Sequence, residues 1–135
     1  PEQLRKYFFF PFENRINLLF KAVRNTIYSI LNESFKKNKK GILKKYTSKI
    51  RYSPGFFAFL HTFGRDLKWN PHIHVLLAEI KLGNNDTVYK WNYFNYDALS
   101  NRFQKILLDL LSKKLGSSFA SIKTELYRKY QICLC

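Results

Sequence analysis

Two histidines separated by one residue lie in a strand-like run, and this pair constrains the possible fold more than any other feature. The run is Trp69-Asn-Pro-His72-Ile-His74-Val-Leu-Leu-Ala-Glu79. In an extended strand, residues two apart point to the same face and lie about 6.6 Å apart, twice the rise of about 3.3 Å per residue. His72 and His74 could therefore hold one metal ion, while the apolar residues that alternate with them pack on the opposite face.

A second strand-like run, residues 55–63, contains a third histidine, His61. The polar connection between the runs, residues 64–70, has a length and composition typical of an antiparallel hairpin with a loop. Such a hairpin brings His61 near the level of His74, although the sequence does not fix the register. A His-apolar-His triplet is also compatible with two structural histidines on a half-buried strand.

The charge of the chain points to a polyanionic partner. Among 135 residues there are 24 Lys+Arg and 9 Asp+Glu, which gives a formal net charge of +15. Nucleic acid is the first candidate partner for so basic a chain. The sequence shows no apolar run of membrane-spanning length, no basic amphipathic anchor and no signal peptide, so we expect no membrane partner. Its two cysteines match neither a zinc site nor a disulfide framework, and we expect a cytoplasmic location.

Basic residues are concentrated between positions 36 and 51, where Tyr46 interrupts them and Tyr52 follows. One interpretation is a solvated, mobile loop. The other is an arm whose lysines contact phosphates while the tyrosines stack on bases. The DNA-binding candidates are the basic residues of this segment together with two from the hairpin connection: Lys36, Lys37, Lys39, Lys40, Lys44, Lys45, Lys49 and Arg51, and then Arg65 and Lys68.

The remaining segments predict helices and one more strand. An aromatic lead-in, residues 1–12, is expected to pack on the domain. Apolar residues at three- and four-residue steps predict an amphipathic helix from Arg15 to Phe35, capped by Asn14. Alternating aromatic residues predict a third strand over residues 87–94.

Two helices are predicted in the last third of the chain. Asp97 is expected to cap the first, which ends at Gly116. Ser117 or Ser118 begins the second, which ends near Tyr130. The order helix, three strands, two helices predicts an α+β fold in which helices cover one face of an antiparallel sheet and the histidines lie on the other. At this length the chain forms one domain at most.

The run His61-Thr-Phe-Gly-Arg-Asp-Leu-Lys-Trp-Asn-Pro-His-Ile-His74 closely resembles the signature of bacterial rolling-circle insertion-sequence transposases of the two-tyrosine HUH type, the IS ninety-one group. The resemblance is ungapped and extends from Leu4 to near Tyr130. It implies an HUH endonuclease-like fold, with the histidine pair on a central strand. It also implies cleavage and joining of single-stranded DNA at mobile-element ends through a 5′-phosphotyrosine.

The resemblance further implies a divalent ion, Mg²⁺ or Mn²⁺, which His72 and His74 hold and which polarises the scissile phosphate. Two histidines are too few ligands, so a third protein ligand is expected. His61 is the first choice from the hairpin geometry, and Asp66 is the second because of its oxygen and its place in the connection. His61 could instead bond to a backbone carbonyl, and Asp66 could be a turn former. Glu79 falls on the opposite face by strand parity.

Compared with the family, the chain is expected to be an internal fragment from a bacterial transposase. Residues 1–130 are expected to form part of the catalytic domain with an incomplete sheet, and residues 131–135 an unstructured tail. The family's zinc-binding module and catalytic tyrosine pair are expected outside the chain. Tyr127 and Tyr130 have the wrong spacing for that pair. Such a fragment is expected to be inactive alone, and the alternative is a catalytically dead nucleic-acid-binding remnant with structural histidines.

Overall fold

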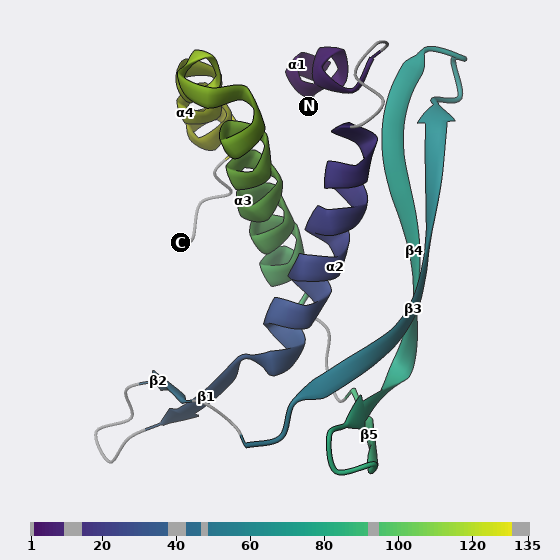
Figure 1. The fold of residues 1–135 in the computed structure, drawn as a ribbon, viewed down its shortest axis with the longest axis vertical. Coiled ribbons are helices and arrows are strands. Elements are labelled where there is room, and N and C mark those ends of the chain that lie inside the picture. The colour runs from purple at the N-terminus through teal and green to yellow at the C-terminus, as the bar shows by residue number, and fades with distance from the viewer. Residues whose placement is uncertain (1, 10–14, 38–42, 47–48, 92–94, 131–135) are drawn as a thin grey trace.

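Two long antiparallel strands lie against two long helices in the structure (Figure 1). This computed structural model describes residues 2–9, 15–37, 43–46, 49–91 and 95–130. In chain order the elements are α1 (Glu2–Arg5), η1 (Lys6–Phe8), α2 (Ile16–Asn32), β1 (Ser34–Lys37), β2 (Leu43–Tyr46), β3 (Tyr52–Phe63), β4 (Trp69–Gly83), β5 (Val88–Lys90), α3 (Tyr96–Leu115), η3 (Gly116–Phe119) and α4 (Ala120–Tyr130).

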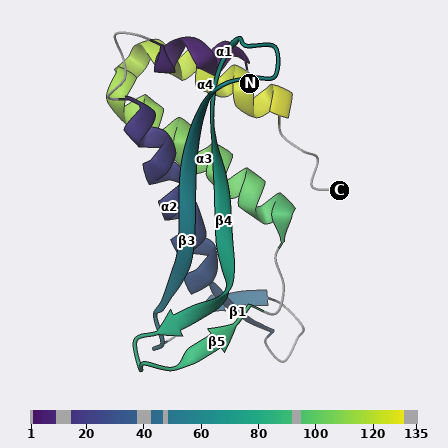
Figure 2. The same cartoon turned by 90° about the vertical axis from the view of Figure 1, so that its right-hand side faces the viewer.

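The main sheet has the strand order β3-β4-β5, and all its described pairs are antiparallel. Strands β3 and β4 form the predicted hairpin, with Leu60 opposite Ile73 and His61 opposite His72. Turned by 90°, the molecule shows β3 and β4 in front of α2 and α3 (Figure 2). The fold is therefore α+β, with helices on one face of an antiparallel sheet, as predicted.

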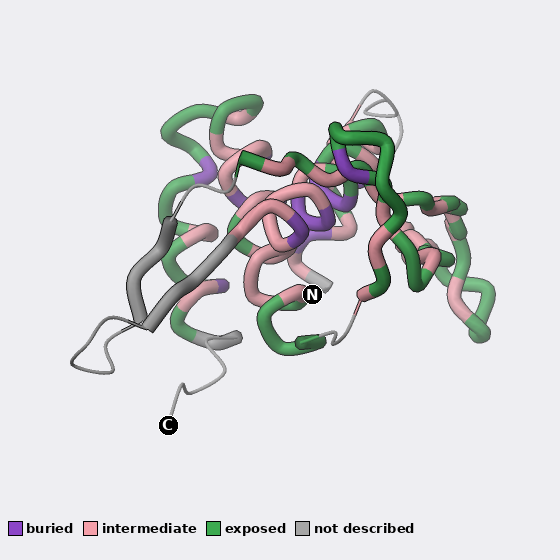
Figure 3. Tube along the Cα trace, turned by 90° about the horizontal axis from the view of Figure 1, so that it is seen from below, coloured by how far each residue is buried: buried purple, intermediate pink, exposed green. Residues whose placement is uncertain are grey.

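The hydrophobic core lies among the helices and on the inner face of the sheet. Its largest fully buried side chains come from the last two helices and the turn between them, and are Leu108, Leu111, Phe119 and Leu126. Leu60 of β3 and Ile73 of β4 pack against this cluster from the sheet. Most buried positions accordingly lie along the helices, whereas the residues of β3, β4 and β5 other than Gly83 are intermediate or exposed (Figure 3).

Polar contacts join the end of α2 to the sheet and to α3. The Asn32 side chain accepts a hydrogen bond from the backbone N–H of Tyr52 at 2.8 Å and donates to the Tyr52 carbonyl at 3.2 Å. The guanidinium of Arg102 in α3 makes two contacts with the Glu33 carboxylate, of 2.8 and 2.9 Å. Bidentate pairing of this kind fixes the relative orientation of the two side chains as well as their distance. Together these contacts hold the end of α2 in a defined position against β3 and α3.

Several predicted boundaries need correction. Asn95 caps α3, because its side chain accepts from the Ala98 N–H at 2.9 Å, and Asp97 lies in the first turn. There its charge complements the positive end of the helix dipole. Gly116, with φ of 70°, ends the helix as predicted. A 3-10 turn precedes α4, which therefore begins at Ala120 and not at Ser117 or Ser118.

The lysine-rich segment is partly strand, because β1 and β2 pair antiparallel where a loop was one interpretation. The third strand is described over Val88–Lys90 only. The predicted cap Asn14, the aromatic residues Phe10 and Phe12, residues 38–42 and 92–94, and the tail 131–135 lie outside the described residues. No helix in the described part of the chain is long and apolar enough to cross a membrane.

We expect Leu111→Ala to lower the free energy of unfolding by about 2–5 kcal/mol, since it leaves a cavity in the core. Leu67→Ala is the matched control, because Leu67 is 82% exposed in the hairpin turn and its truncation should cost less than about 0.5 kcal/mol. Urea denaturation followed by circular dichroism measures both. Equal effects of the two substitutions would contradict the assigned core.

Candidate metal centre

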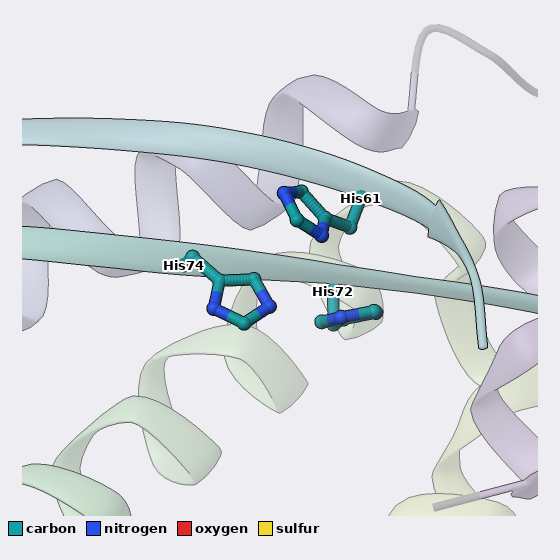
Figure 4. A group of neighbouring side chains, drawn as sticks. All are labelled: His61, His72 and His74. Carbon is teal, nitrogen blue, oxygen red and sulfur yellow. The ribbon is translucent and has the colours of Figure 1, made fainter. Parts of the chain in front are cut away.

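Three histidines from two strands converge on the sheet face opposite the helices (Figure 4). His61 of β3 lies directly opposite His72 of β4, and His74 lies opposite Phe59. Because directly opposed residues point to the same face, all three imidazoles share one surface. The expectation that His61 lies near the level of His74 needs one correction: its direct partner is His72, and His74 is its diagonal neighbour.

The distances between the imidazoles suit a common metal ion. Each ring offers a nitrogen, and these ligand atoms all lie within 4.8 Å of one another. The ring centroids of His61 and His74 are 4.3 Å apart, those of His72 and His74 5.0 Å, and those of His61 and His72 5.5 Å. Metal–nitrogen bonds are about 2.0–2.1 Å long, so two nitrogens bound to one tetrahedral ion are about 3.3 Å apart. Small side-chain rotations would bring three ligands to one ion.

A hydrogen bond determines which nitrogen of His72 can bind a metal. Nδ1 of His72 lies 2.6 Å from the backbone carbonyl oxygen of Asn70, which can only accept. Nδ1–H is therefore the donor, and Nε2 keeps its free lone pair. A ligand histidine commonly has its other N–H held by a carbonyl or carboxylate in this way, which fixes the tautomer and the ring orientation.

An irregularity in β4 precedes His72. Between the pairs His61–His72 and Phe63–Trp69, β4 has one residue more than β3, which forms a bulge containing Pro71. Proline is tolerated there because it has no N–H to contribute to a ladder. Trp69 anchors the start of the bulge through edge contacts with Phe63 and Phe9, at centroid distances of 5.9 and 5.6 Å. The bulge thus aligns His72 with His61.

Asp66 has a different place from the three imidazoles. Its Oδ1 accepts from the backbone N–H of Lys68 at 3.3 Å, and its Oδ2 lies 3.5 Å from the Lys68 Nζ. These contacts match the interpretation of Asp66 as a turn former, and Asp66 is not part of the three-histidine group. Glu79 lines a cavity of about 760 Å³ between β4 and the helices, on the other face of the sheet.

The structure separates the DNA-binding candidates into two groups. Arg65 and Lys68 are exposed in the β3–β4 turn, near His61, whereas Lys49 and Arg51 lie before the other end of β3. Four more, Lys36 and Lys37 in β1 and Lys44 and Lys45 in β2, are described only as paired strand residues. Lys39 and Lys40 lie outside the described residues.

Tyr52 is engaged within the fold. Its ring contacts Tyr89 edge-on at a centroid distance of 5.2 Å, and the Lys81 Nζ lies 4.1 Å from its centroid. Burial lowers the pKa of Lys81 below its ordinary value. This cluster could not be predicted from the sequence, since only the register brings residues from three strands together.

Tyr127 packs against the core, and its surroundings do not activate it. Burial, followed by the nearby Asp109 carboxylate, raises the pKa of the Tyr127 hydroxyl above its ordinary value. A nucleophilic tyrosine needs an accessible, more acidic hydroxyl. The structure therefore adds a chemical reason to leave Tyr127 out of the catalytic set.

We expect the neutral His72 ring to carry its proton on Nδ1, because Asn70 accepts from that nitrogen. Long-range ¹H–¹⁵N correlation spectra of the imidazoles at high pH report the tautomer of each ring. His61 and His74, which have no comparable carbonyl contact among the described hydrogen bonds, serve as internal references. An Nε2–H tautomer for His72 would contradict the described orientation.

Comparison with known proteins places the chain in a family. The family model described as "Putative transposase" matches residues 55–132. A transposase for insertion sequence element IS801, from Pseudomonas savastanoi pv. phaseolicola, is 37% identical over 57 residues, which make up 42% of this chain and 14% of that protein. The chain thus matches only a small part of that relative's length. No solved structure gives a significant match. Because the family match covers more than half of the chain and all three histidines, the protein belongs to this transposase family.

Proposed function

We propose that the protein acts in DNA transposition, as the metal-binding part of a two-tyrosine HUH nuclease of the IS ninety-one group that cleaves and rejoins single-stranded DNA. The observation that carries the proposal is the convergence of His61, His72 and His74 on one exposed sheet face. The family match and the insertion-sequence relative support the same process.

In this proposal the three histidines hold a divalent ion. Nε2 of His72 is oriented for the task by the Asn70 carbonyl. Of the two ions implied by the resemblance, Mn²⁺ suits three imidazoles better than Mg²⁺, which prefers oxygen ligands. When bound, such an ion would act as a Lewis acid on a phosphate oxygen and orient the strand. The exposed side of the site leaves room for that phosphate, since His61 and His74 are exposed.

Single-stranded DNA at mobile-element ends is the proposed partner. The net charge of +15 favours a polyanion, and Arg65 and Lys68 lie in the turn next to the histidines. Lysines of the β1–β2 segment would add sequence-independent affinity, with a slope of about −0.7 in log–log salt dependence per phosphate neutralised on a single strand. Asp66, which pairs with Lys68, would help to position that cation.

Tyr127 is not the proposed nucleophile, because its ring packs against the core and burial raises the pKa of its hydroxyl. The resemblance instead assigns the attack to a tyrosine pair downstream of the matched segment. It also implies a zinc-binding module upstream of that segment. Residues 1–130 are accordingly proposed as one part of the catalytic domain. We place this part in the bacterial cytoplasm, where the DNA substrate is found.

A nucleic-acid-binding module with structural histidines is the second candidate, and the high positive charge favours it independently of any metal. The two candidates differ in what the histidines do. The first requires ion affinity that depends on His72, and the second requires none.

We expect His72→Ala to abolish Mn²⁺ binding in isothermal titration calorimetry, because it removes a ligand whose orientation is fixed. Affinity for an oligodeoxythymidylate, measured without metal, should change less than about twofold, since the phosphate contacts are made by other residues. Asp66→Asn is the matched control and should keep Mn²⁺ affinity, as Asp66 lies outside the group.

Unchanged Mn²⁺ affinity in His72→Ala, or no Mn²⁺ binding by the wild type, would favour the plain binding module. Loss of Mn²⁺ affinity in Asp66→Asn would instead make the turn carboxylate a ligand.

A further inference from the structure

The outer face of β3, β4 and β5 carries large apolar side chains that are exposed. Counting along the paired strands, its large apolar side chains are between 46% and 67% exposed, and they are Phe57, Phe59, Phe63, Leu76, Ile80, Leu82 and Val88. Contiguous exposed apolar surface is costly in water and usually marks a binding site. The three histidines lie within this same face, so the apolar surface and the metal centre are continuous.

Two phenylalanines form an ordered row beside the metal centre. Phe57 and Phe59 are stacked with centroids 6.4 Å apart and planes inclined by 21°, and they are 67% and 54% exposed. Phe59 is the cross-strand partner of His74, and Phe57 is the partner of Leu76. A DNA strand that runs from the histidines along β3 would therefore contact Phe59 first and Phe57 next.

The charges around this face favour a polyanion. No Asp or Glu occurs among the outward-facing residues of the described strands β3, β4 and β5. Lys90 points outward at one end, where it pairs with Ile80, and Arg65 and Lys68 lie in the turn at the other end. A second copy of the chain would bring another +15 of charge against these cations, which disfavours self-association through this face.

We propose that Phe57 and Phe59 are a base-stacking platform that receives the bases of single-stranded DNA next to the phosphate held at the histidines. The inference rests on the proposed function, and it adds how the substrate strand is held. Every base has a π-face that can stack on an aromatic ring, whereas a duplex hides those faces within its own stack. The platform therefore selects single-stranded over double-stranded DNA without reading sequence.

The test measures binding of a fluorescein-labelled oligodeoxythymidylate of about 16 nucleotides by fluorescence anisotropy, in EDTA. Phe57→Leu and Phe59→Leu keep an apolar side chain but remove the ring, and each should weaken binding about fivefold or more. Phe57→Tyr keeps an aromatic ring, so its affinity for the oligonucleotide should stay within about twofold of the wild-type affinity. Affinity for the corresponding duplex should change little in all these variants, because its binding depends on phosphate contacts.

Leu76→Ala is the matched control. Leu76 is the partner of Phe57 across the strands and is 66% exposed, so it tests apolar contact without an aromatic ring. Its affinity for the oligonucleotide should change less than about twofold. Circular dichroism spectra and melting curves of all variants should match the wild type, because the substituted side chains are exposed.

Each other outcome has a distinct meaning. Equal affinities in the wild type and both leucine variants would overturn the platform and leave the proposed function intact. If Leu76→Ala lowers the affinity for the oligonucleotide as much as Phe57→Leu does, general apolar contact would replace stacking as the explanation. The same holds if Phe57→Tyr binds as weakly as Phe57→Leu. Failure of the wild type to bind single-stranded DNA would overturn the DNA-binding part of the proposed function together with the platform. A wild-type dimer in sedimentation that Phe57→Leu dissociates, with DNA affinity unchanged, would assign the face to a second copy.

Discussion

The backbone hydrogen bonds between β3 and β4 place His61 opposite His72, and the other features of the site depend on that pairing. A shift of one residue in one strand would turn its outward residues toward the helices, because side chains alternate between the two faces. Packing opposes such a shift, since Leu60 and Ile73 would leave the core cluster. The hydrophobic core thus stabilises the geometry of the histidines, although it lies on the other side of the sheet.

The scaffold that supports the hairpin is helical. Fully buried side chains from α3, η3 and α4 form the centre of the core, and α2 lies against both long strands. Asn32 joins the end of α2 to the backbone of Tyr52, where β3 begins. The outer face carries the three histidines and exposed aromatic rings and contributes little to the core. Because the side chains of this face are not needed for core packing, they are available for binding.

Much of this arrangement could be predicted from the sequence, because it follows from local periodicity. Alternation along residues 69–79 assigned the histidines and the packed residues to opposite faces, and the polar connection at residues 64–70 predicted the hairpin. The register could not be predicted, since it depends on a bulge at Pro71 and on packing between distant segments. The helix cap was placed at Asp97 and not at Asn95 because both residue types can cap a helix; in the structure the Asn95 side chain accepts from the Ala98 N–H. The exposure of Phe57 and Phe59 was also missed, because an apolar run does not reveal which of its faces is covered.

The central claim is that three histidines form one metal centre, and paramagnetic broadening of their imidazole NMR signals by Mn²⁺ tests it most directly. The chain has three histidines, so each signal can be assigned by a single substitution. We expect the signals of His61, His72 and His74 to broaden together at low Mn²⁺ concentration. Broadening of none, or of His72 and His74 without His61, would contradict a three-histidine centre.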